Sequence, residues 1–178
     1  IKKKVMRGLS EPAGIITFPG VTGYTKALDK RLPYDVDAAK NLLAEAGYPN
    51  GFDVELRCPN DRYVNDEAIC TAVVGMLGKI GVNVNLFAQT KSKHFKELKD
   101  NQGDFYMLGW GVPTLDSHYV FHYLYETEAS WNKVNFSNSD VDAAIRVMEG
   151  EVDLDKRNAA IANAWKIVRD DIAYLPLH

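Results

Sequence analysis

The sequence lacks the features that mark membrane-spanning proteins, nucleic-acid-binding proteins and several common enzyme classes. No stretch approaches the run of about 20 apolar residues that spans a bilayer, and Ile1 is followed by lysines instead of the apolar segment of a signal peptide. No GxSxG, Walker A or GxGxxG motif is present. The 21 basic and 24 acidic side chains nearly balance and form no long basic run, which argues against nucleic acid as a partner. We therefore expect a globular protein that is not an enzyme and holds no cofactor.

Cysteine is also scarce, since Cys58 and Cys70 are the only two in the chain. They lack the CxxC spacing of a redox motif, and two cysteines alone do not make a metal site. They are able to form a disulfide in an oxidising compartment, but the sequence does not show it. Two buried or half-buried free thiols are the interpretation that we favour from the sequence.

The length and composition are those of one globular domain. The chain has 178 residues, of which 46% are hydrophobic and 25% charged, enough to bury a sizeable core. We expect residues 1–178 to form a single domain. Its first part, residues 1–33, reads as an irregular segment because glycine and proline recur there.

The rest of the sequence alternates between helix and strand patterns. Apolar residues at helical spacing predict a helix from its N-cap Asp35 to Gly47. The patterns further predict strands over 52–57, 82–86 and 104–111, helices over 64–80, 91–101 and 117–125, and two closing helices capped by Ser139 and by Asp153 or Asp155. Strand, helix, strand in this order favours parallel pairing. We expect an α/β fold with a mixed, mainly parallel sheet of roughly four to six strands flanked by helices, in which the apolar third strand is central.

The end of the predicted third strand offers a candidate ligand site. Trp110 stands between Gly109 and Gly111, and in open α/β sheets ligands bind outside the carboxyl ends of the strands. Exposed backbone beside a flat ring suits a small polar ligand, although a core tryptophan with glycines for close packing explains the same residues. Arg62 follows the first strand at the same predicted edge, where its guanidinium is able to bind a carboxylate through two hydrogen bonds. A solvated arginine is the alternative, but a cation is unfavourable at a helix N-terminus.

His118 and His122 are the sharpest candidates for metal ligands. They lie four residues apart on a predicted helix, and Glu126 continues the row. Imidazoles at this spacing chelate transition metals, so a protein that binds a metal or a metal chelate is our alternative function. Partly buried, hydrogen-bonded histidines are the interpretation that we favour, because no glutamate follows His118 as in an HExxH motif. We therefore assign no metal site from the sequence.

Several motifs together are similar to those of a known family. They are YD at 34–35, AKNLLAEAGY at 39–48, NGF at 50–52, IGV at 80–82, GWG at 109–111 and YLPL at 174–177. In this combination and order, the chain resembles the family 5 extracellular solute-binding proteins, which are the dipeptide-, oligopeptide- and nickel-binding components of ABC importers.

The resemblance implies a lobe of the type II periplasmic-binding-protein fold, in which two lobes close around a ligand. It implies that residues 1–178 are the C-terminal lobe and that a missing N-terminal lobe of the same parent chain carries the signal sequence. The expected ligand is a peptide or a peptide-like solute, and the expected partner is an ABC permease in the inner membrane. The expected location is the periplasm, or the outer surface of a Gram-positive cell for a membrane-anchored lipoprotein.

The resemblance also implies roles for single residues. Arg62 stands where dipeptide binders hold the peptide carboxylate, and Trp110 with Gly111 stands at the strand end that lines the ligand cleft. The family places an aspartate for the peptide amino group three residues after the tryptophan, but this sequence has Pro113 there. Asp116 matches a later family aspartate, and it either reaches into the cleft or caps the next helix.

Overall fold

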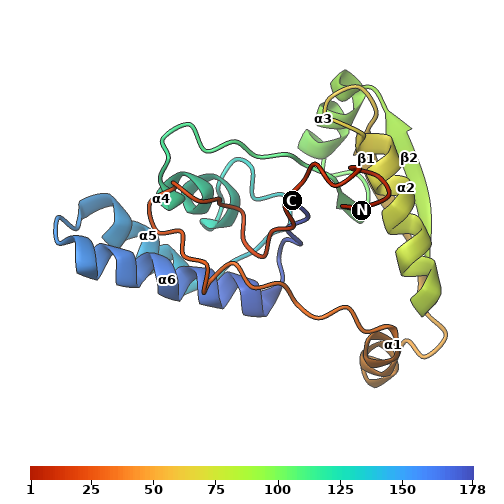
Figure 1. Ribbon diagram of the computed structural model, residues 1–178, viewed down its shortest axis with the longest axis horizontal. Helices are drawn as coiled ribbons and strands as arrows, with labels where there is room; N and C mark the ends of the chain where they lie inside the picture. The colour runs from red at the N-terminus through yellow and green to blue at the C-terminus, as the bar shows by residue number, and fades with distance from the viewer. The chain divides into compact units, whose positions relative to one another are not determined.

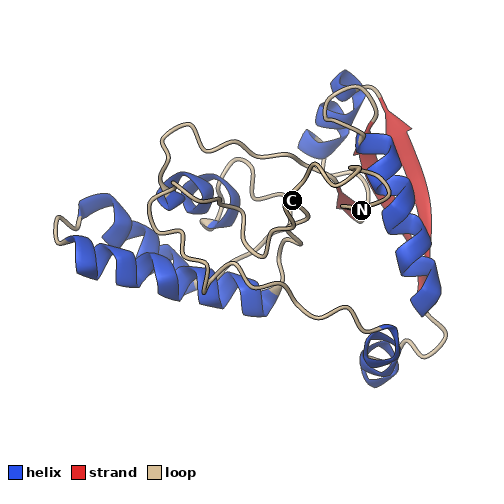
Figure 2. Ribbon diagram, in the orientation of Figure 1, coloured by secondary structure: helices blue, strands red, loops and turns tan.

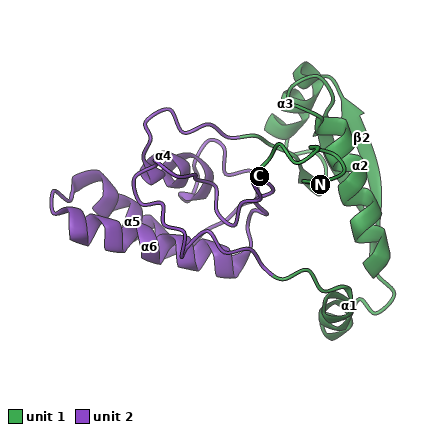
Figure 3. Cartoon of the chain, in the orientation of Figure 1, with its two compact units in different colours: residues 1–10, 33–109 green, residues 11–32, 110–178 purple.

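The computed structural model (Figure 1) describes all residues from 1 to 178. It contains helices, one small sheet and long irregular segments between them (Figure 2). Backbone contacts divide the chain into two compact units (Figure 3). The first comprises residues 1–10 and 33–109, and the second comprises residues 11–32 and 110–178. None of the helices is both long and apolar enough to cross a bilayer.

The first unit is built on a parallel sheet with the strand order β2-β1-β3. Strands β1 (Phe52–Pro59) and β2 (Val82–Gln89) pair in register along their whole length, whereas β3 (Phe105–Tyr106) pairs only with the second half of β1. The strand-helix-strand order therefore gives the parallel pair that the sequence predicts. The sheet has three strands, all parallel, so the mixed sheet of four to six strands is not present in this chain.

The predicted central position of the third strand is wrong. Strand β3 lies at the sheet edge and contains two residues, while β1 is central. Most residues of 104–111 are apolar for a reason other than burial between two neighbouring strands. Met107 packs against the core of the first unit, whereas Trp110 packs among aromatic rings of the second unit. Two separate clusters thus account for an apolar stretch that resembles a buried strand.

Three helices accompany this sheet: α1 (Val36–Glu45), α2 (Asp66–Leu77), which continues as the 3₁₀ turn η1 (Gly78–Ile80), and α3 (Lys91–Lys99). Asp35 caps α1 as predicted, its carboxylate accepting a hydrogen bond of 2.9 Å from the Ala38 amide. Helix α2 runs alongside β1 and β2 (Figure 1). The core beneath it comprises Leu56, Cys58 and Cys70, with Val73, Val84, Leu86, Phe105 and Met107 packed around them.

The opposite face of β1 is also buried where α3 contacts it. Arg57 alternates with apolar residues along β1, yet only 8% of it is accessible. Its guanidinium donates to Glu55 at 2.7 Å, and its central carbon lies 3.9 Å from the Phe87 ring centre. A charged residue is tolerated inside because these partners replace the water that it loses.

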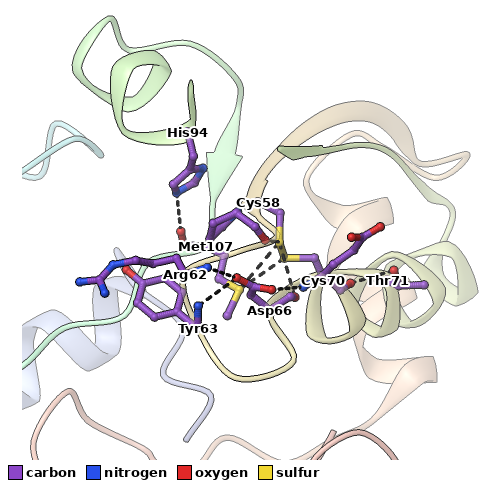
Figure 4. The surroundings of a disulfide bond; sticks show 10 residues. Cys58, Arg62, Tyr63, Asp66, Cys70, Thr71, His94 and Met107 are labelled. Carbon is purple, nitrogen blue, oxygen red and sulfur yellow. Dashed lines mark hydrogen bonds between the residues drawn. A yellow bond between two sulfur atoms is a disulfide. The ribbon is translucent and has the colours of Figure 1, made fainter. Parts of the chain in front are cut away.

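Cys58 and Cys70 form a disulfide, so the expectation of free thiols is wrong (Figure 4). Cys58 lies near the end of β1 and Cys70 in the first turns of α2. The turn between these elements folds the helix back onto the sheet and brings the two Cα atoms to 6.5 Å, within the range that a disulfide spans. The sequence did not show this pairing because it depends on how α2 docks against β1.

The second unit is helical. The short helix α4 (Ser117–Val120) continues directly as the π-helical turn η2 (Phe121–Tyr125), and α5 (Ser139–Gly150) packs against α6 (Leu154–Asp171). The buried side chains that join these helices are Phe121, Leu124, Ile145, Ile161 and Trp165. The segment 11–32 contributes no helix or strand beyond a bridge between Thr22 and Asp116, in agreement with its many glycines and prolines.

The ends of α5 and α6 differ slightly from the sequence prediction. Asn138, rather than Ser139, caps α5 by accepting from the amides of Asp140 and Val141. Asp153 caps α6, which is one of the two predicted alternatives. The spacing of Ile161, Trp165 and Val168 places Ile172 on the same apolar face, but Ile172 is the C-cap of this helix with a φ of 62° and is 44% exposed. The helix ends one residue earlier than the apolar pattern indicates, so this side chain turns outward.

Candidate functional site

The predicted site residues fall in both units. Arg62 belongs to the first unit, and Trp110, Gly111 and Asp116 belong to the second.

Asp66 fixes the loop that carries Arg62. One carboxylate oxygen of Asp66 accepts hydrogen bonds of 2.9 Å from the amides of both Arg62 and Tyr63, and the other accepts from the Glu67 amide (Figure 4). Asp66 itself is 5% exposed. Burial alone raises the pKa of Asp66, but these backbone donors outweigh burial and hold the pKa below its ordinary value. The carboxylate therefore stays ionised and holds the loop in one conformation.

The Arg62 guanidinium extends from this fixed loop, away from the Asp66 carboxylate (Figure 4). Arg62 is exposed, and its central carbon lies 5.3 Å from the Tyr63 ring centre. No carboxylate of the chain forms an ion pair with it. A guanidinium on a rigid backbone with all five donors unpaired is a good partner for a carboxylate or a phosphate.

Tyr63 also approaches the chain just after β3. Its hydroxyl donates to the Gly109 carbonyl at 3.4 Å. A Cβ atom at Gly109 would lie 2.6 Å from the ring, so any other residue there would displace the Tyr63 ring. Sequence reasoning missed Tyr63 and Asp66, although an acidic side chain in the first turn of a helix is known to reach back to a preceding amide, as in a capping box.

Trp110 lies within a cluster of aromatic rings. The ring centres of Tyr119, Tyr123 and Trp131 lie 6.0 to 6.1 Å from its own. The tryptophan is half-buried, and its Nε1 atom is buried without a hydrogen-bond partner. Gly111 beside it is exposed, and a Cβ atom there would meet nothing within 4 Å. Open backbone thus adjoins a ring that three other rings hold in place.

Asp116 caps helix α4 rather than standing free. Its carboxylate accepts from the His118 amide at 2.9 Å and from two nitrogens of Arg157 at 2.9 and 3.0 Å. Burial raises the pKa of Asp116, but the Arg157 guanidinium and the His118 amide outweigh it and lower the pKa overall. Of the two alternatives from the sequence, the structure thus has the capping arrangement. Arg157 was missed because it lies 41 residues away on another helix.

The stretch from 117 to 125 presents three faces. One is buried in the core through Val120, Phe121, Leu124 and Tyr125. The second carries Tyr119 and Tyr123, which pack against Trp110. The third carries His118 and His122, which are half-buried rather than enclosed. The aromatic residues of this helix thus pack on two different faces, and the two histidines lie on a third, polar face.

Glu149 of α5 joins the two histidines. The ligand atoms that His118, His122 and Glu149 offer all lie within 4.8 Å of one another. His118 Nε2 is 3.4 Å from Glu149 Oε1, and His122 Nδ1 is 2.7 Å from Glu126 Oε2. No sequence pattern points to Glu149, because only the packing of α5 against α4 brings it to the histidines.

The fold is that of type II periplasmic binding proteins, as predicted. A dipeptide-binding protein from Pseudoalteromonas sp. SM9913, solved in complex with Met-Leu, is similar with a TM-score of 0.90 at 24% sequence identity. The similarity covers 99% of this chain and 36% of that one.

Residues 1–132 match the model of the bacterial extracellular solute-binding proteins, family 5 (middle region), and the chain belongs to this family. Heme-binding protein A of Haemophilus influenzae is 28% identical over 153 residues, which are 82% of this chain and 27% of that protein. The dipeptide-binding protein of Escherichia coli is 29% identical over 140 residues, which are 77% of this chain and 26% of that protein. The chain thus matches about a quarter of the length of these relatives, which are named for binding a solute and not for catalysis.

Proposed function

We propose that this chain is the C-terminal lobe of the solute-binding component of an ABC importer and that its solute is a peptide or a peptide-like molecule. The proposal rests mainly on the exposed, unpaired guanidinium of Arg62. Its backbone is fixed by the ionised Asp66, and its guanidinium is exposed and unpaired. Such a group binds the terminal carboxylate of a peptide through two parallel hydrogen bonds.

Trp110 and Gly111, which belong to the second unit, are separate candidates for contact with the solute. The Trp110 ring offers a flat apolar surface, and the exposed Gly111 backbone offers hydrogen-bonding groups to an extended peptide. The dipeptide-binding relative of Escherichia coli and the Met-Leu complex from Pseudoalteromonas support a solute of this class.

Asp116 is a poor partner for the amino group of a peptide. Its two oxygens already accept from Arg157, and Pro113 has no side-chain acceptor. We therefore expect recognition in this lobe to depend on the carboxylate of the solute and to tolerate a blocked amino group.

In this proposal a further lobe of the same parent protein closes over the solute, and an ABC permease of the inner membrane receives it. The location is the periplasm, or the extracellular surface for a membrane-anchored form. The disulfide between Cys58 and Cys70 supports an oxidising compartment.

The test is a thermal-shift and calorimetric titration of the intact parent protein with tripeptides in four forms: free, amino-acetylated, carboxyl-amidated and doubly blocked. Free and acetylated peptides should raise the melting temperature, whereas amidated and doubly blocked peptides should not. Arg62→Ala should weaken binding of the free peptide by at least about tenfold, the loss expected for hydrogen bonds to a charged group. Arg146→Ala, which removes an exposed arginine of α5, is the matched control. Equal binding of acid and amide peptides, or full binding by Arg62→Ala, would refute the proposed site.

A further inference from the structure

One face of the helix formed by α4 and η2 carries two histidines with nearly parallel rings. The ring centres of His118 and His122 lie 5.6 Å apart, with an angle of 19° between the ring planes. Both side chains are partly accessible, 28% for His118 and 42% for His122. They differ in this from His94, which is fully buried and hydrogen-bonded to the Met107 carbonyl. The pair is therefore not explained as a set of enclosed core histidines.

Glu149 approaches the same point from a different helix. Its Oε1 atom lies 3.4 Å from His118 Nε2, and one ligand atom from each of the three residues lies within 4.8 Å of the others. Two donors that each bind a tetrahedral zinc ion at about 2.0–2.1 Å are about 3.4 Å apart. His118 and Glu149 already have this separation. Because all three side chains are partly or largely exposed, the remaining adjustment requires only side-chain rotation.

Glu126 contacts the His122 ring. Its Oε2 atom lies 2.7 Å from His122 Nδ1, a buried nitrogen that makes no regular hydrogen bond at the present ring orientation. A rotation of either side chain would form this bond, and Nε2 of the ring would then be the metal ligand. A carboxylate on the far nitrogen of an imidazole is the usual support of a metal-binding histidine, since it fixes the ring and increases its basicity. The glutamate that continues the histidine row thus has a defined role.

We propose that His118, His122 and Glu149 bind one divalent transition-metal ion, such as Zn²⁺ or Ni²⁺, with Glu126 orienting the His122 ring. Imidazole nitrogens and a carboxylate oxygen are suitable ligands for these ions. Three protein ligands leave the fourth tetrahedral position to water or to a donor atom of a bound molecule. The site lies entirely within the second unit and does not depend on the proposed peptide function.

The experiment is a calorimetric titration of the intact parent protein, freed of metal with a chelator, with Zn²⁺ and separately with Ni²⁺. A saturable site is expected in the unaltered protein. His118→Gln, His122→Gln and Glu149→Gln should each weaken it by more than Glu126→Gln does, and the loss for Glu126→Gln should be about 10- to 100-fold. His178→Gln and Glu45→Gln, which change an exposed histidine and an exposed glutamate elsewhere, should bind as the unaltered protein does.

Two further measurements make the result decisive. Circular dichroism of each metal-free variant establishes that folding is retained, which we expect because the four side chains are not enclosed. Co²⁺ should give an intense visible absorption typical of four-coordination in the unaltered protein, and this absorption should be absent in His122→Gln. Absence of saturable binding, or binding unchanged in both histidine variants, would overturn the metal site. Arg62→Ala should retain metal binding, so failure of the peptide site is distinguished from failure of this one.

Discussion

Arg157 donates to Asp116 through both of its terminal nitrogens, at 2.9 Å from Nη1 to Oδ2 and 3.0 Å from Nη2 to Oδ1. Its Nε atom also donates to the Met148 carbonyl at 2.8 Å. One guanidinium therefore connects the start of α4, the last turns of α5 and the first turns of α6. The family resemblance places Asp116 near the ligand, but its carboxylate is already engaged in this ion pair with Arg157.

Replacing Arg157 by methionine should destabilise the protein, because it leaves the partly buried Asp116 carboxylate without its counter-ion. We expect a loss of about 2–3 kcal/mol in the free energy of unfolding, somewhat below the value for a fully buried pair. Urea denaturation at neutral pH measures it. Lys156→Met, which removes an exposed pair with Asp153, is the neighbouring control and should change stability by less than about 1 kcal/mol. Similar small losses in both variants would contradict the role given to Arg157.

His94 should make stability depend on pH. Its Nε2 donates to the Met107 carbonyl at 3.0 Å, and burial lowers the pKa of His94, although Glu97 and Asp66 act in the opposite direction. With the folded pKa below the unfolded one, the unfolded state binds more protons once the pH falls below about 6.5. The free energy of unfolding should therefore fall with decreasing pH in that range, by up to about 1.4 kcal/mol per pH unit from this residue.

Urea denaturation of His94→Gln at several pH values between about 7.5 and 5 tests this expectation. Glutamine retains a donor for the Met107 carbonyl but does not titrate, so the variant should have the shallower pH dependence even if it is less stable at neutral pH. His178→Gln, at an exposed position, should keep the original slope. An unchanged slope in His94→Gln would show that His94 does not contribute.

The disulfide between Cys58 and Cys70 should contribute about 3 kcal/mol to stability, because it restricts the unfolded chain over a short loop. Reduction should lower the urea midpoint of the unaltered protein by a corresponding amount. The double variant Cys58→Ala, Cys70→Ala should resemble the reduced protein and be insensitive to reductant. Rapid alkylation of both cysteines in denatured but unreduced protein would show that the bond is absent.

Gly51 should tolerate alanine much less than Gly47 does. Both have positive φ angles, 73° and 91°, which cost an alanine about 1–2 kcal/mol. A Cβ atom at Gly51 would also lie 1.8 Å from the Gly81 carbonyl oxygen, whereas nothing lies within 4 Å at Gly47. We expect Gly47→Ala to lose only the conformational cost and Gly51→Ala to lose more than about 4 kcal/mol or to fail to fold. Equal stabilities by urea denaturation would contradict the close contact of these two turns.

The local elements were largely predictable from the sequence. The spacing of apolar residues, the N-cap Asp35 and the terminating Gly81 located α1, α2 and the strand pair, because each signal acts over a few residues. The third strand, expected over 104–111 at the centre of the sheet, is present only as the short edge strand β3, for a related reason. An apolar run indicates burial but not the partner that provides it, and here two different clusters bury its residues.

In the candidate sites, too, local features were predictable from the sequence and contacts between distant residues were not. Residue types and their spacing within one element were enough to identify the family, to single out Arg62 as a candidate and to find the histidine row. The folded chain was needed to show that Cys58 pairs with Cys70, that Arg157 neutralises Asp116 and that Glu149 lies beside His118. These pairs lie 12, 41 and 31 residues apart, and they form because packed helices and strands bring distant side chains together, which no local pattern encodes.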